Sequence, residues 1–117
     1  MRWRRRHSGP PGQTVYYRGW GGVSMPRVPQ DPLPAEEARD LTSHYRARYD
    51  DRGRMVSFTK ILNGKSVWED SYLYWDGGNL RRRVMSRADG PTLVEDYDTR
   101  GRLVSDSQGR PGTAEGH

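Results

Sequence analysis

The 117-residue sequence contains no cysteine, and it has only one phenylalanine and three histidines. Without cysteine, disulfide bonds and thiolate metal sites are excluded, which fits a reducing cytoplasm. No apolar run approaches the roughly 18 residues that a membrane-spanning helix needs. The basic start at residues 1–7 is followed by the Gly- and Pro-rich residues 8–12 rather than by an apolar segment, which argues against a secretory signal. We therefore expect a cytoplasmic protein that does not engage a membrane.

Long tracts of one charge are also absent beyond the first residues. Residues 1–13 hold four arginines and no acidic residue, whereas residues 14–107 hold 15 basic and 14 acidic side chains. The formal net charge of +5 thus gives no reason to expect nucleic-acid binding by the body of the chain. We expect disordered tails at 1–13 and 108–117 and a single β-rich domain at 14–107, because the tails have too little apolar surface to offset the entropy cost of ordering.

Apolar residues are scarce, at 32% of the chain, so the core must be small. Seven tyrosines and four tryptophans must supply much of it, and their rings suit a sheet with half-buried faces. Residues 15–20 are β-prone. The four prolines within residues 24–34 then favour an extended, irregular segment. Residues 34–41 combine an initial proline, acidic residues and helix formers, which predicts one short helix.

One motif recurs three times in the remainder of the chain. It reads Tyr-Asp-Asp-Arg-Gly-Arg-Met-Val at residues 49–56, and it returns at 97–104 and, in degraded form, at 74–80. In each copy a glycine lies four residues after the tyrosine, which predicts a type I turn followed by a G1 bulge. Asn63-Gly64 is the strongest two-residue hairpin signal. We therefore predict a mainly β fold, an antiparallel meander of about six strands with one short helix and an irregular N-terminal cover segment.

The turns also define a register if side chains alternate regularly through each strand. In that register one face, here named the tyrosine face, carries seven large residues. They are Tyr49, Met55, Tyr72, Tyr74, Leu80, Tyr97 and Leu103. The same alternation places Arg82 on the tyrosine face, close to Asp70 and Glu95, and it places Phe58, Met85 and Arg83 on the opposite face. We predict that the N-terminal segment packs on the tyrosine face.

The repeated hairpin resembles a known bacterial motif. Tyr-Asp-x-x-Gly-Arg-Leu/Met-Val, at residues 49–56 and 97–104, is similar to the YD repeat of Rhs-type bacterial proteins. Those proteins build large β shells from long arrays of such hairpins. Three copies cannot enclose a space, so this resemblance implies the hairpin alone.

A second resemblance covers most of the chain. Tyr17-Arg18, residues 22–26 and residues 45–61 are similar to a family of short uncharacterised bacterial proteins. Its pattern runs approximately YRxYSGVxLP, YRAYFDxxGRLVxFEK and YEYxxxGxLxR, and this sequence departs from it at residues 20–21 and 75–76. The resemblance implies a bacterial origin and a domain of unknown function. It brings no catalytic residue with it.

The sequence shows no constellation of catalytic or metal-binding residues. His44 has no second histidine or cysteine at ligand spacing, so we expect a solvated surface side chain. The acidic pairs at 50–51, 69–70 and 95–96 are adjacent in sequence, and neighbouring residues of a strand point to opposite faces rather than flanking one cleft. Asp70 and Glu95 share the tyrosine face, where ion pairing with Arg82 is the simpler interpretation. We expect no catalytic residue, no metal and no cofactor.

The candidates for nucleic-acid contact are six arginines. They are Arg2, Arg4, Arg5, Arg6, Arg81 and Arg83. Phosphate contact is one interpretation of these side chains. The second interpretation involves no nucleic acid. The N-terminal arginines then have no fixed role, and two of the three arginines at 81–83 are surface charges while one is paired.

Taken together, the sequence favours a non-catalytic binding or interaction module with an unknown protein partner. Two alternatives stay open. One is nucleic-acid binding through the basic tail and Arg81–Arg83. The other is a small enzyme with a cleft between the sheet and the N-terminal segment, which we favour less.

Overall fold

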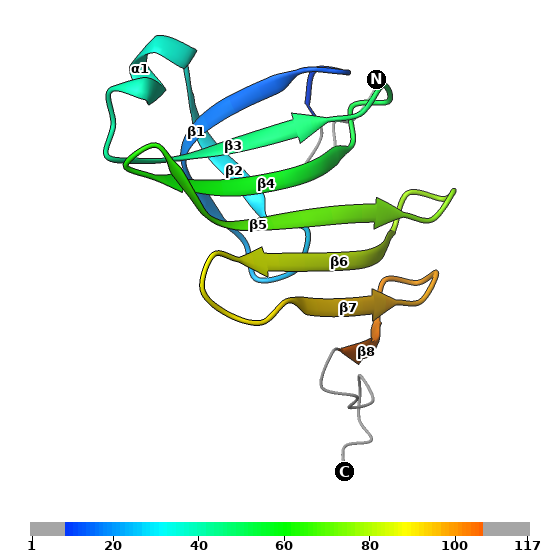
Figure 1. Cartoon of the computed structure of the whole chain (residues 1–117). Coiled ribbons are helices and arrows are strands. Elements are labelled where there is room, and N and C mark those ends of the chain that lie inside the picture. The colour runs from blue at the N-terminus through cyan, green and yellow to red at the C-terminus, as the bar shows by residue number, and fades with distance from the viewer. Residues whose placement is uncertain (1–8, 107–117) are drawn as a thin grey trace.

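The computed structural model describes residues 9–106 of the chain, and most of both predicted tails lies outside that range. The described part forms one antiparallel sheet of eight strands with a short helix (Figure 1). The elements are β1 (Thr14–Gly21), β2 (Val28–Leu33), α1 (Ala35–Arg39), β3 (Ser43–Tyr49), β4 (Met55–Leu62), β5 (Lys65–Tyr74), β6 (Leu80–Arg87), β7 (Leu93–Tyr97) and β8 (Leu103–Asp106). Their order across the sheet is β2-β1-β3-β4-β5-β6-β7-β8.

The mainly β, antiparallel architecture is confirmed, but the predicted number of six strands is too small, because β1 and β2 extend the sheet beyond β3. The prediction that residues 24–34 form no regular ladder is wrong for residues 28–33. β2 forms a ladder with β1 in which Pro29 pairs with Trp20 and Pro32 pairs with Tyr17. Proline is tolerated there because β2 is an edge strand, which needs hydrogen-bond donors on one side only.

The β1–β2 hairpin curls over the tyrosine face. Figure 1 shows β1 and β2 passing behind β3–β5. Tyr17, Trp20 and Met25 pack against core residues of β3–β6, and the backbone N–H of Arg27 donates a hydrogen bond to the Tyr72 hydroxyl at 3.3 Å. The predicted packing of the N-terminal segment on the tyrosine face is therefore confirmed, although the cover is built from two strands of the same sheet.

The turns form as the repeated motif predicts. In the first copy, the N–H of Gly53 donates to the Asp50 carbonyl, and Gly53 has a φ of 78°. Asp50 Oδ1 also accepts bonds from the backbone N–H groups of Arg52 and Arg54, both at 2.9 Å. Asp98 accepts the equivalent pair of bonds in the third copy. In the hairpin at Asn63-Gly64 both residues have positive φ, as a type I′ turn requires.

Each repeat turn is followed by a β-bulge that reverses the alternation of side chains. In the first copy Tyr49 pairs with Met55 while Arg48 pairs with Ser57, so one residue between them has no partner. The same irregularity follows the turns into β6 and β8. The extra residues are Val56, Arg81 and Val104. A bulge moves every later residue of the strand to the other face.

The bulges correct the predicted faces. Phe58 and Met85, expected on the opposite face, are buried on the tyrosine face, and Phe58 belongs to the core. Arg83 also lies there, opposite Tyr72 of β5, whereas Arg82 pairs with Leu73 and points away. The residues next to the turns are unaffected, because the bulge comes after them. Accordingly, six of the seven predicted residues lie in or against the core: Tyr49, Met55, Tyr72, Tyr74, Leu80 and Tyr97.

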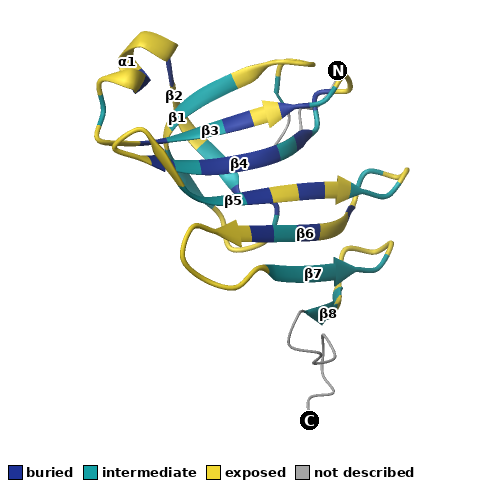
Figure 2. Ribbon diagram, in the orientation of Figure 1, coloured by how far each residue is buried: buried dark blue, intermediate teal, exposed yellow. Residues whose placement is uncertain are grey.

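Burial is concentrated in β3–β6 and falls to intermediate values in β7 (Figure 2). The predicted helix forms as α1, with Pro34 at its N-cap position and Ala38 buried. It contacts β1. No helix in residues 9–106 is long and apolar enough to cross a membrane.

Candidate functional sites

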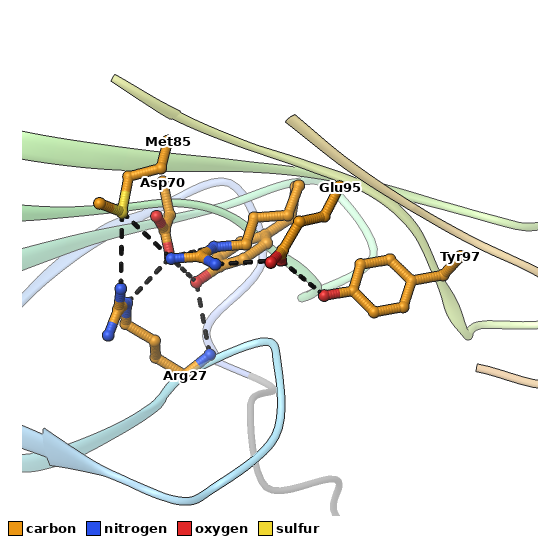
Figure 3. A network of polar contacts seen from close by, with 7 residues as sticks. Arg27, Asp70, Met85, Glu95 and Tyr97 are labelled. Carbon is orange, nitrogen blue, oxygen red and sulfur yellow. Dashed lines mark hydrogen bonds and ion pairs between the residues drawn. The ribbon is translucent and has the colours of Figure 1, made fainter. Parts of the chain in front are cut away.

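Asp70, in β5, lies at the centre of a buried polar network on the tyrosine face (Figure 3). Its Oδ2 atom accepts hydrogen bonds from Arg27 Nε at 2.9 Å and from Arg83 Nε at 3.1 Å. The Tyr72 hydroxyl donates a third bond to the same oxygen at 2.7 Å. Arg27 comes from the connection between β1 and β2, and Arg83 comes from β6. One carboxylate thus joins the cover to two neighbouring strands.

Arg27 is held from several directions. Its guanidinium carbon lies 4.3 Å from the ring centroid of Trp20 and 4.4 Å from that of Trp68. Its Nη2 atom also donates to the sulfur of Met85 at 3.7 Å. A guanidinium between two aromatic faces retains favourable electrostatics after most of its water is removed. Arg27 is not among the predicted site residues, because nothing in its proline-rich surroundings indicates a buried charge.

Arg83 extends the network to β7. Its Nη1 atom donates to Glu95 Oε1 at 3.0 Å, and the Tyr97 hydroxyl donates to the same oxygen at 2.7 Å. The predicted pairing of these carboxylates with Arg82 is wrong. Arg82 lies on the opposite face and binds Asp96 there, through Nε at 2.7 Å. The extra residue of the β6 bulge is the reason for the exchange.

The Asp70 network is closed to solvent, since Asp70 is 0% exposed and Arg83 is 5% exposed. Burial, followed by the charge of Asp70, raises the pKa of Tyr72. Burial opposes the charge of Arg83, but Asp70 and Glu95 outweigh it and raise the pKa of Arg83. Polar groups do converge beneath the N-terminal cover, as the enzyme hypothesis requires. Asp70 Oδ2 and Glu95 Oε1 accept bonds from other members of the network, whereas Asp70 Oδ1 is buried without a hydrogen-bond partner.

The arginine run at 81–83 is divided between the two faces. Arg83 is in the Asp70 network, and Arg82 is paired with Asp96. Arg81 is exposed, and its guanidinium carbon lies 5.0 Å from the ring centroid of Trp75. It forms no ion pair with any residue of the described part of the chain. Arg2, Arg4, Arg5 and Arg6 lie outside the described residues.

A partly apolar surface surrounds Trp75 at one end of the sheet. We name it the Trp75 surface, and it consists of Leu73, Trp75, Arg81, Arg82 and Asp96. It is a shallow hollow of ≈ 360 Å³, and a second hollow of ≈ 410 Å³ shares Trp75 and Arg81 with it. The indole N–H of Trp75 donates to the Tyr97 carbonyl at 3.2 Å, which fixes the orientation of the ring. Leu73 is 56% exposed beside it.

His44 is placed differently from the sequence prediction. It was expected to be solvated, but it is only 8% exposed. Its ring packs edge-on against Tyr16, with the centroids 5.7 Å apart. Burial, and then the positive charge of Arg46, lowers the pKa of His44, so the ring is neutral at pH 7. The prediction is wrong because Tyr16 of β1 packs on the ring and α1 stands across a hollow from it, which the pattern of residues 43–49 does not reveal.

The fold and these sites define a small antiparallel β domain in which a buried ion network joins the β1–β2 cover to β5 and β6. Within residues 9–106 no group of three or more His, Asp or Glu side chains is arranged to hold a metal ion. Residues 10–106 match a family of unknown function, DUF6156. The chain belongs to this family. No curated protein and no solved structure matches it.

Proposed function

We propose that this protein is a non-catalytic binding domain that holds an extended, acidic segment of a partner protein on the Trp75 surface. The observation that carries the proposal is the arrangement of Trp75 and Arg81. A ring fixed by its own hydrogen bond lies beneath an exposed cation that forms no ion pair in the described residues, although its charge contributes to lowering the pKa of Asp96. Tryptophan and arginine are the residue types that most often dominate binding energy at protein interfaces.

The neighbouring side chains define the chemistry of the partner. Leu73 adds exposed apolar area next to Trp75. Arg82 is already neutralised by Asp96, so Arg81 supplies the free charge. An acidic side chain of the partner would bind Arg81, and an apolar side chain beside it would cover Leu73 and Trp75. The cytoplasm, which the lack of cysteine favours, is the compartment in which we place this interaction.

Nucleic-acid binding is the competing function, and the geometry supports it less. Phosphate binding benefits from several unpaired cations in one place. Of the run at 81–83, Arg83 is buried with Asp70 and Glu95, and Arg82 is paired with Asp96. Arg81 alone remains, unless the N-terminal arginines contribute.

Site-specific photo-crosslinking in cells tests the proposal. A benzophenone amino acid is introduced in place of Leu73 and, as a matched control, in place of Leu62, which is 39% exposed at the far end of β4. We expect one protein to crosslink at position 73 and not at position 62. Arg81→Glu should abolish that crosslink, because it reverses the charge that faces the partner. Lys65→Glu makes the same charge reversal at the start of β5, at the opposite end of that strand from Leu73, and it should preserve the crosslink.

Three results would contradict the proposal. The first is the same set of crosslinks at positions 73 and 62. The second is a crosslink that survives Arg81→Glu in a protein with an unchanged melting temperature. The third is a product at position 73 that nuclease removes, which would favour nucleic acid instead. In that case binding to a short single-stranded oligonucleotide should weaken steeply with salt.

A further inference from the structure

A third hollow, separate from the two around Trp75, lies beneath α1. It has a volume of ≈ 280 Å³, close to the lower end of the range for small-molecule sites. Residues from α1, β1, β3 and β4 form its walls. Ala38 and Ile61 provide apolar contact, and Tyr16, His44 and Arg46 provide polar groups.

Two polar atoms of this α1 pocket have no partner. They are His44 Nδ1 and Arg46 Nε, both buried and both without a hydrogen bond. In the described part of the chain, only one other buried side-chain nitrogen or oxygen, Asp70 Oδ1, is in that state. Folded proteins rarely leave buried donors unpaired, because each has lost its hydrogen bonds to water without replacing them. Both atoms belong to residues that line the α1 pocket, so a ligand that enters the pocket and reaches them could supply the missing acceptor.

The charges around the pocket specify that acceptor further. Arg46 Nε is a permanent donor, and the neutral His44 ring donates from Nδ1 when that nitrogen carries its proton. Arg39 adds a third basic group, and no acidic residue lines the pocket. Glu69 lies on the same face, two strands from Arg46, but it accepts a bond from Thr59 at 3.1 Å and forms no ion pair with Arg46. The pocket is therefore basic and lacks an internal counter-ion.

We infer that the α1 pocket binds a carboxylate, held by Arg46 Nε and His44 Nδ1, with a short apolar body against Ala38 and Ile61. The two oxygens of a carboxylate match two buried donors, whereas a phosphate would leave further charged oxygens against apolar walls. The carboxylate can belong to a small organic acid or to the C-terminus of a peptide. This inference is independent of the function proposed for the Trp75 surface.

The inference is tested by titrating the full-length protein with small probes. Binding is monitored through the NMR signals of the His44 ring and the Arg46 side chain. The probes are butyrate, its neutral analogue butyramide, inorganic phosphate, and Ala-Ala-Val with a free or an amidated C-terminus. We expect saturable shifts of both signals with butyrate or with the free peptide, and none with butyramide or the amidated peptide. If only the peptide binds, the carboxylate is a chain terminus; if butyrate binds as well, a free acid is sufficient.

Arg46→Gln should weaken carboxylate binding about tenfold or more, because it removes a charge-assisted hydrogen bond. Arg48→Gln is the matched control, since Arg48 lies two residues further along β3, is exposed and does not line the pocket. Equal loss in both variants would overturn the inference, as would equal binding of butyrate and butyramide, binding of phosphate alone, or no shift with any probe. The comparison of butyrate with butyramide uses the unmodified protein and so remains decisive if Arg46→Gln does not fold.

Discussion

The Asp70 carboxylate faces two guanidinium groups without contact with water, so its charge is essential to both. Asp70→Asn preserves the size of the side chain but leaves Arg27 without an acidic partner, while Arg83 keeps only Glu95. Breaking a buried ion pair from one side costs about 3–5 kcal/mol, because the remaining charge is desolvated and unpaired. We expect urea denaturation to show a loss of that order in the free energy of unfolding.

The chain contains a matched control for this change. Asp96→Asn removes the same charge from a solvent-exposed pair with Arg82. Exposed ion pairs contribute little, because water already solvates both partners. We therefore expect Asp96→Asn to leave the denaturation midpoint nearly unchanged. Similar midpoints for the two variants would mean that the Asp70 network does not stabilise the fold.

At the level of single elements, the turns of the three repeats make different demands on their glycines. Gly53 and Gly101 both have positive φ, at 78° and 89°. A Cβ on Gly53 would also lie 2.7 Å from the Gly9 carbonyl oxygen, whereas one on Gly101 meets nothing within 4 Å. In the second copy the equivalent glycine is Gly78, with a φ of 104°, and the preceding Gly77 has neither constraint. Alanine should thus reduce the melting temperature most at Gly53, less at Gly101, where the strain costs about 1–2 kcal/mol, and least at Gly77. The reverse order would contradict the turn geometry.

The elements were predictable where a local rule determines them. Asn63-Gly64 and the Asp-x-x-Gly turns follow from backbone preferences of a few adjacent residues, so the hairpins are confirmed. The faces were only partly predictable. Gly53 predicts the G1 bulge, but regular alternation ignores the extra residue that the bulge adds to β4 and therefore predicts the wrong face for Phe58. The edge position of β2 also depends on the whole sheet, which its prolines alone do not reveal.

At the scale of the whole molecule, the sites depend on contacts between distant segments. Asp70 meets Arg27, which is 43 residues earlier in the chain. His44 is buried against Tyr16, which lies on another strand, β1. Neither contact has a local signature, since periodicity reports which residues share a face and not which segment covers that face. The network, the α1 pocket and the Trp75 surface therefore became visible only in the folded arrangement.

Arg27, between Trp20, Trp68 and Asp70, joins the β1–β2 cover to β5, in addition to the β1–β3 ladder and the packing of Tyr17, Trp20 and Met25 on the core. Arg27→Leu removes the charge and the hydrogen bond while keeping an apolar side chain at the site. We expect native-state hydrogen exchange to accelerate in β1 and β2 and to stay slow in β3–β5, because an edge hairpin can open without unfolding the central strands. Arg18→Leu, which removes an exposed pair with Glu37 from the same hairpin, should change neither. Uniform acceleration across all strands in Arg27→Leu would instead show that the cover and the central sheet unfold as one unit.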